Sequence, residues 1–108
     1  MTEYNLQVQN QWLKLIAAGY KTVEGRLRKD KFNDLKVGDV IVFNKIFKKK
    51  VTSIRYYKTF YAYLLAEGLS RTLPGVESIR EAIDVYRALY SIEDEIKYGV
   101  IAITLTSE

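Results

Sequence analysis

The 108-residue sequence predicts an α+β fold in which short strands form a sheet and helices pack around it. Three observations lead to this prediction: the strand-like segments are few and mostly short, the last of them is continuously apolar, and helical segments gather after the sheet-forming region. The last strand could close a small barrel, but its periodicity is equally compatible with an open sheet. We expect a single domain, residues 1–108, with the order β-α-β-β-β-α-α-β.

The N-terminal segments show first a strand period and then a helix period. Leu6 and Val8 alternate with polar neighbours in residues 4–9, which indicates a short strand. The next segment has apolar residues at helical spacing. Asn10 is the expected N-cap of this helix and Gly19 its C-terminal stop.

From residue 22 the period changes to two, which indicates a second strand. Glu24 and Arg26 would then point to the same face of that strand. A charged loop over residues 28–39 follows, and the apolar run 40–44 is expected to be a strand buried on both faces. Residues 45–57 are typical of a turn that leads into a further strand.

The second half of the chain is mainly helical. Residues 59–68 form the first expected helix, and the stretch 69–75 contains the proline and is expected to be a loop. A Ser-x-x-Glu capping box and an apolar stripe predict an amphipathic helix over residues 78–90. A short turn over residues 91–95, capped by Ser91, and the closing strand 98–106 complete the order.

The composition limits the chemistry that the chain can perform. It contains no cysteine and no histidine, which excludes disulfides, Cys or His nucleophiles and thiolate or imidazole zinc sites. We expect neither a metal nor a cofactor. No run of 18 apolar residues and no signal-peptide pattern are found, so we expect a cytoplasmic, intracellular monomer that is not secreted and does not interact with a membrane.

The charges are distributed unevenly along the chain. Residues 1–58 contain 13 lysines and arginines against 5 acidic residues, whereas residues 59–108 contain 4 against 8. A basic face suits a phosphate-bearing partner such as RNA or a nucleotide. The same charges could instead serve solubility, and the acidic half could contact a basic protein.

Three ionisable residues lie close together in the segment GYKTVEGR: Lys21, Glu24 and Arg26. Residues two apart on one strand face are near enough for an arginine to pair with a carboxylate. This pair could be a surface salt bridge worth roughly 0–1 kcal/mol. Alternatively it could form the wall of a cleft in which Lys21 directs its charge at a ligand.

A second group of candidates combines cations with aromatic rings. Single-stranded nucleic acids are commonly bound by cations that neutralise phosphates and by rings that stack on bases. Tyr86 and Tyr90 share the apolar face of an expected helix, so we assign them to the core instead. The candidate ligand contacts in this second group are Lys48, Lys49, Lys50, Arg55 and Tyr57.

The segment GYKTVEGR matches the GxKxxExR signature of the ASCH (activating-signal-cointegrator homology) domain family. The chain also resembles this family in residues 35–43, 73–91 and 98–103, in the same order. The resemblance implies a fold similar to the PUA superfamily, a small β-barrel with helices packed around it. It further implies an RNA-binding function and a cleft lined by Lys21 and the Glu24–Arg26 pair.

Some small ASCH proteins are amidohydrolases that remove the acetyl group from N4-acetylcytidine, and others have been proposed as ribonucleases. In the amidohydrolases the signature lysine is catalytic, a threonine stands at the position of Glu24, and a glutamate precedes the long helix. This chain keeps Lys21, and its nearest acid before that helix is Glu77. The resemblance therefore leaves open an alternative function, a hydrolase that uses Lys21 and Glu24 on a modified nucleoside or single-stranded RNA.

Overall fold

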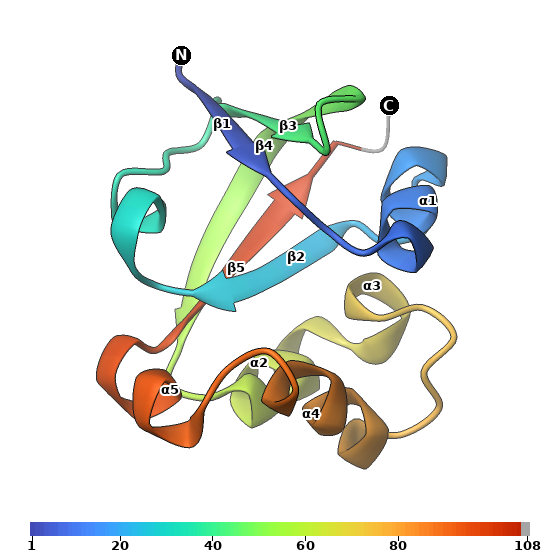
Figure 1. Ribbon diagram of the computed structural model, residues 1–108, viewed down its shortest axis with the longest axis vertical. Helices are drawn as coiled ribbons and strands as arrows, with labels where there is room; N and C mark the ends of the chain where they lie inside the picture. Colours follow the sequence, from blue (N-terminus) through green and yellow to red (C-terminus); the bar gives the residue numbers. More distant parts are fainter. Residues whose placement is uncertain (107–108) are drawn as a thin grey trace.

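The computed structural model describes residues 1–106, which form a mixed five-stranded sheet with helices packed around it (Figure 1). The spatial order is β1-β3-β4-β5-β2, with β1 parallel to β3 and the other neighbours antiparallel. The sheet curls into half of a barrel, with β1 and β2 as its two edges. The strands are β1 (Glu3–Leu6), β2 (Val23–Leu27), β3 (Val40–Phe43), β4 (Phe47–Tyr57) and β5 (Val100–Leu105).

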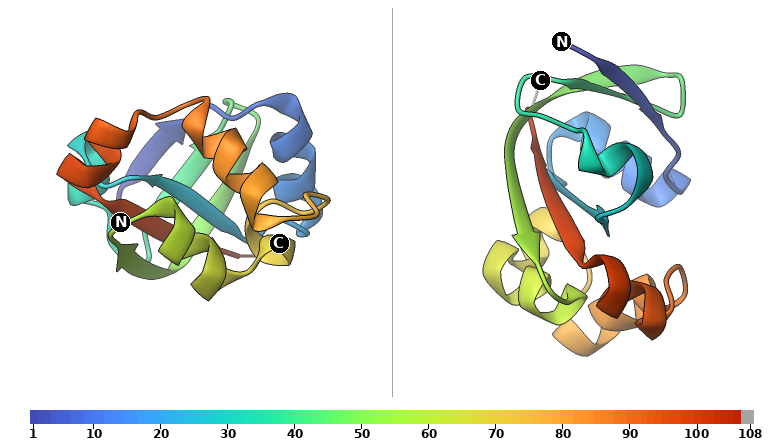
Figure 2. Two further views of the ribbon diagram at one scale, coloured as in Figure 1. Left: turned by 90° about the horizontal axis from the view of Figure 1, so that it is seen from below. Right: turned by 90° about the vertical axis from the view of Figure 1, so that its left-hand side faces the viewer.

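The helices lie in two places relative to the sheet. Figure 2 shows α1 and the 3-10 helix η1 on the concave side of the curled sheet, while the remaining helices gather at one end of it. This arrangement confirms the predicted α+β class. The helices are α1 (Asn10–Ala18), η1 (Asp30–Asn33), α2 (Phe60–Glu67), α3 (Leu69–Thr72), α4 (Ile79–Arg87) and α5 (Ile92–Tyr98).

The expected element order lacked the 3-10 helix η1, which lies in the expected loop 28–39, and two short α-helices. Residues 69–75, expected to be a loop, contain α3, and residues 91–95, expected to be a turn, belong largely to α5. The Oγ of Ser91 does cap α5, because it accepts a hydrogen bond from the Asp94 amide at 3.1 Å. Both helices are too short to establish an apolar stripe, so their periodicity gave no signal.

The predicted helix ends are mostly confirmed. Thr59 and Ser78 cap α2 and α4 by accepting hydrogen bonds from amides in the first turn at 3.0 and 3.1 Å. Gly19 ends α1 with a left-handed backbone at φ 86°. The N-cap prediction was wrong: Asn10 is the first helical residue, and the extended backbone of Gln9 precedes it.

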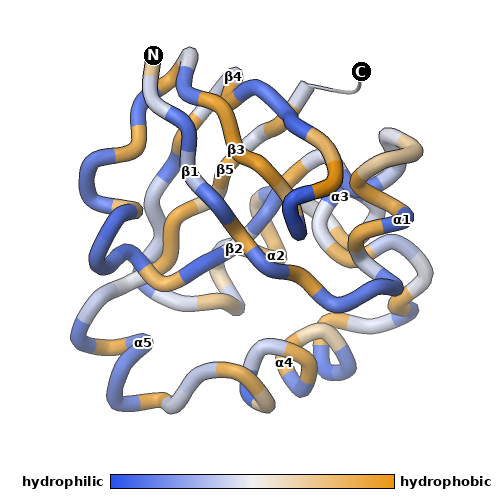
Figure 3. Tube along the Cα trace, turned by 45° about the horizontal axis from the view of Figure 1, so that its top comes forward, coloured by the Kyte–Doolittle hydropathy of each residue, from blue (hydrophilic) through white to orange (hydrophobic). Residues whose placement is uncertain are grey.

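The core has two parts, one on each face of the sheet. Ile41 and Phe43 belong to the part on the concave side, together with apolar residues of α1. Phe60 and Tyr63 belong to the part between the sheet and α2 and α4. The prediction that residues 40–44 are buried on both faces was wrong, because β3 alternates between fully and partly buried residues. β3 appears as a hydrophobic segment in Figure 3 because both sets are apolar.

The apolar character of the last strand is explained by its position. β5 lies between β4 and β2, and residues 100–103 are all buried. The strand begins at Val100 and not at residue 98, because Tyr98 is the last residue of α5 and Gly99 turns the chain with φ 72°. Within the part of the chain that the structure describes, no helix combines the length and the hydrophobicity needed to cross a bilayer.

Candidate functional site

The GxKxxExR segment runs from the end of α1 into the edge strand β2. After Gly19, the amide of Lys21 donates to the carbonyl of Leu15 at 3.1 Å, which folds the chain back against α1. β2 then directs Glu24 and Arg26 to one face of the sheet. The other face of β2 packs against the core beneath α2 and α4. The charged side chains therefore lie at the seam between the two parts of the core.

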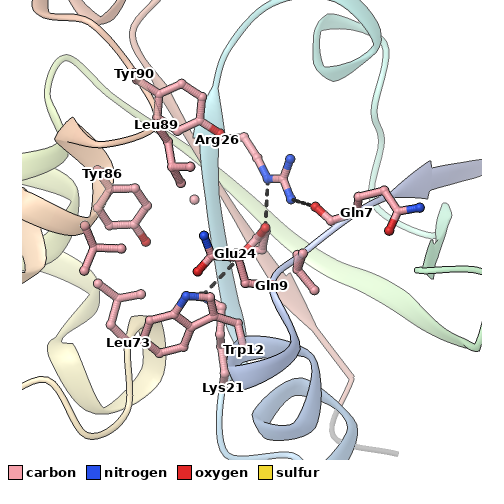
Figure 4. A pocket seen from close by; sticks show the side chains of 13 residues that line it. Gln7, Gln9, Trp12, Lys21, Glu24, Arg26, Leu73, Tyr86, Leu89 and Tyr90 are labelled. Atoms are coloured by element: carbon pink, nitrogen blue, oxygen red, sulfur yellow. Dashed lines mark hydrogen bonds and ion pairs between the residues drawn. The ribbon is translucent and has the colours of Figure 1, made fainter.

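A pocket of about 210 Å³ lies at this seam (Figure 4). The motif residues Lys21, Glu24 and Arg26 contribute to its lining from β2 and the preceding turn. Four other segments complete the wall: the segment between β1 and α1, the helix α1 with Trp12, Leu73 directly after α3, and the helix α4 with the residues that follow it. The three ionisable side chains thus converge on a concave surface and do not spread over a flat one.

Lys21 is almost completely buried, with 3% of its surface exposed. Its Nζ donates to the backbone carbonyls of Val23, at 2.9 Å, and Thr72, and it lies 3.3 Å from Oε1 of Glu24. These acceptors use the three N–H donors of an ammonium group. Burial lowers the pKa of Lys21 below its ordinary value, against the opposing effect of the Glu24 carboxylate.

Glu24 lies between two cations and is 6% exposed. Its Oε2 accepts a hydrogen bond from Nε of Arg26 at 2.8 Å, while Oε1 faces Lys21. Burial acts to raise the pKa of Glu24, but the two positive charges and their hydrogen bonds outweigh it and hold that pKa below its usual value. Arg26 also donates from Nη2 to the carbonyl of Gln7 at 3.0 Å, which ties β2 to the segment after β1.

Aromatic side chains line the pocket on two sides, with Trp12 beside Lys21 and two tyrosines on another side. Trp12 comes from α1, and Tyr86 and Tyr90 come from α4 and the residues after it. Both tyrosine rings stack on Phe60, at centroid distances of 4.4 and 5.4 Å. The assignment of the two tyrosines to the core was therefore incomplete, since they pack on the core and also face the pocket. Sequence periodicity identifies such a stripe but not the cavity beside it.

The lysine candidates lie on another part of the sheet. Lys48, Lys49 and Lys50 lie within β4, shortly after the turn over residues 44–46, and pair with β3. Lys48 forms an exposed ion pair with Glu3 at 2.9 Å. Lys49 points to the buried face, because side chains alternate along a strand. The three lysines therefore do not form one basic face.

Arg55 and Tyr57 form hydrogen bonds with a second buried carboxylate, that of Glu67 at the end of α2. Arg55 donates to both oxygens of Glu67, from Nε at 2.6 Å and from Nη2 at 2.7 Å, and the hydroxyl of Tyr57 also donates to it. These hydrogen bonds lower the pKa of Glu67. The structure therefore brings Lys21, Glu24 and Arg26 together at the pocket and places Arg55 and Tyr57 elsewhere.

Over residues 1–106, the acidic side chains do not gather in groups of three or more that could hold a metal ion. The groups that the pocket offers to a ligand include aromatic faces, the edge of a carboxylate and a guanidinium. Such a set can stack on a planar ring and hydrogen-bond to its edge.

Comparisons with known proteins place the chain in a family. Among solved structures, the hypothetical protein PH0355 is 43% identical with a TM-score of 0.93, and 97% of each chain is covered. Protein PF0455 from Pyrococcus furiosus is 45% identical with a TM-score of 0.82, over 95% of this chain and 94% of that one.

A more distant similarity concerns the fold alone. A variant of ZmASCH from Zymomonas mobilis is 16% identical with a TM-score of 0.65, over 96% of this chain and 67% of that one. A comparison with curated proteins found no significant match. The family model of the ASCH domain matches residues 6–108, nearly the whole sequence. The chain belongs to the ASCH domain family.

Proposed function

We propose that the protein binds single-stranded RNA, or a nucleotide, by accepting one base in the pocket beside β2. The observation that carries this proposal is the composition of the pocket, in which the aromatic Trp12 and Tyr90 face a fixed carboxylate. Its volume of about 210 Å³ is smaller than the roughly 300–1,000 Å³ of pockets for drug-sized ligands, and so favours a single planar group. The RNA-binding function generally attributed to ASCH domains agrees with this ligand.

The aromatic wall would provide affinity and the carboxylate would provide orientation. Stacking of a base on an aromatic side chain contributes roughly 1–3 kcal/mol. Each oxygen of Glu24 keeps a lone pair beyond its contact with Lys21 or Arg26, so the carboxylate can accept a hydrogen bond from an N–H on a base edge. Because both cations hold the carboxylate in place, little side-chain entropy is lost when the base binds.

The same contacts favour binding over the hydrolase alternative. A lysine nucleophile or base needs a free lone pair on Nζ. The Nζ of Lys21 instead donates to two backbone carbonyls and faces Glu24. Lys21 therefore supports the floor of the pocket, and Glu24 rather than Lys21 meets the ligand.

Trp12 provides a direct test, because it is the single tryptophan of the chain and it lines the pocket. Its fluorescence is followed during titration with nucleoside monophosphates and with short single-stranded RNA. We expect a saturable change with both ligands, since a stacked base alters the surroundings of the indole.

The variant Leu89→Glu places a negative charge at the rim of the pocket, and Leu65→Glu makes the same change on α2. The two leucines are a matched pair, because each is 57% exposed. We expect Leu89→Glu to weaken binding at least tenfold and Leu65→Glu to leave it unchanged. An unchanged Trp12 signal in the wild type, or equal losses in both variants, contradicts the proposal. Turnover of N4-acetylcytidine or cleavage of RNA would support the hydrolase instead.

A further inference from the structure

A second depression adjoins the proposed base pocket. Its volume is about 400 Å³, and Arg26 and Tyr90 line both hollows. It lies where β2 continues into η1 and is lined there by Lys29, Lys31 and Phe32. Arg26 and Tyr90 therefore form the boundary that the two hollows share.

The second depression is basic and partly aromatic. Three cations, Arg26, Lys29 and Lys31, line it against one acid, Asp30. Lys31 is exposed and donates one hydrogen bond from Nζ, to the carbonyl of Asn5 at 2.5 Å. An ammonium group has three N–H donors, so Lys31 keeps donors for a phosphate. The depression therefore has a positive balance even without Arg26, whose charge is paired with Glu24, because two lysines lie against one acid.

The basic surface continues beyond η1 into a third depression of about 580 Å³. Lys29 connects the two, because its Nζ lies 5.2 Å from the ring centroid of Tyr98, which lines the third depression. Arg28 lies there over the exposed ring of Tyr56 at 4.0 Å. The cations that line this depression are Arg28, Lys58 and Lys97.

We propose that these two depressions form a basic track, defined by Lys29 and Lys31 beside η1 and by Arg28 and Lys97 beside α5, that binds the phosphates of the RNA strand whose base occupies the pocket. This inference rests on the proposed function and extends it from one base to several nucleotides. Rings that line both depressions suit unpaired bases, which can stack on them. The track thus replaces Lys48–Lys50 as the phosphate contact.

The test compares double variants that each remove two positive charges. Lys29→Gln/Lys31→Gln alters the first part of the track. Lys48→Gln/Lys50→Gln is the matched control, because both of its lysines are exposed on β4 and lie outside the three depressions. Binding of a labelled RNA of roughly ten nucleotides, within the range of ~4–16 for single-strand sites, is measured by anisotropy at several salt concentrations.

We expect the track variant to bind this RNA about tenfold more weakly. For this variant, the slope of log affinity against log salt concentration should become shallower by roughly 0.7 for each lost phosphate contact. A nucleoside monophosphate should bind as in the wild type, and the β4 control should keep its affinity. A second variant, Arg28→Gln/Lys97→Gln, should also weaken the longer RNA, which keeps the test valid if the first variant does not fold.

The outcomes separate this inference from the proposed function. If mononucleotides change the fluorescence of Trp12 but both track variants bind the longer RNA normally, the base pocket stands and the track is refuted. Equal losses in the track variants and the β4 control also refute it, since they indicate non-specific attraction. If the longer RNA depends on the track without changing the Trp12 signal, the proposed continuity with the pocket is wrong. If no RNA or nucleotide binds the wild type, both proposals fail.

Discussion

Replacement of Lys21 by methionine tests whether this lysine supports the pocket or takes part in chemistry. The change keeps an unbranched side chain but removes the donors to the carbonyls of Val23 and Thr72 and to Oε1 of Glu24. Glu24 keeps Arg26 as a partner, so its charge remains compensated. Two backbone carbonyls lose a donor, and a buried group without its partner costs about 1–3 kcal/mol. We therefore expect a loss of about 3 kcal/mol in the free energy of unfolding.

The assay is urea denaturation followed by circular dichroism, with thermal melting as a second measurement. A loss of about 3 kcal/mol lowers the Tm of a domain of this size by roughly 12 °C or more. The control is Lys14→Met, on the exposed side of α1, and surface changes of this kind cost within about 0.5 kcal/mol. If Lys21→Met unfolds like Lys14→Met, the reasoning about its buried contacts is refuted.

Two further predictions concern packing and pH. A Cβ at Gly25 would lie 2.4 Å from Cζ of the buried Tyr63, so urea denaturation of Gly25→Ala should show a loss of roughly 1–3 kcal/mol, and an unchanged midpoint would contradict this packing. The pKa values of Glu24 and Glu67 lie below the ordinary value of about 4.3. The ionised carboxylates therefore stabilise the fold above that pH, and this stabilisation is lost as the pH falls through the lowered pKa values. The urea midpoint should be nearly constant from neutrality to about pH 5 and should decrease below it, and a flat profile down to about pH 3 would contradict the prediction.

The orientation of Glu24 and Arg26 could be predicted because it depends on local alternation along a strand. The helix caps at Thr59 and Ser78 were predictable for the same reason, since a cap and its first-turn amide are neighbours in sequence. The hydrogen bond from Lys21 to the carbonyl of Thr72 joins residues far apart in the sequence, and it forms only because α3 packs against β2. No local pattern contains that contact.

Two other sequence patterns are each compatible with more than one environment. Arg55 lies among lysines and aromatic residues, which is typical of a nucleic-acid contact, but Glu67 follows within reach and takes up its charge. A helix stripe that contains Tyr86 and Tyr90 is compatible both with a core and with the wall of a pocket. The difference depends on what lies opposite, and here the segment after β1 leaves a cavity.

The residues of the GxKxxExR signature support the pocket, whereas the exposed cations of the basic track would attract phosphates. The charges of Lys21 and Arg26 are directed at Glu24 and at backbone carbonyls, so they add little to the field that an approaching RNA meets. Buried pairs are also weakly screened by salt, whereas exposed cations such as Lys31 and Lys97 lose their attraction as salt rises. Changes at the signature should therefore alter stability at all salt concentrations, while changes on the basic track should alter the salt dependence of binding. A loss of RNA binding in Lys21→Met follows from a deformed pocket and is no evidence that this lysine touches the ligand.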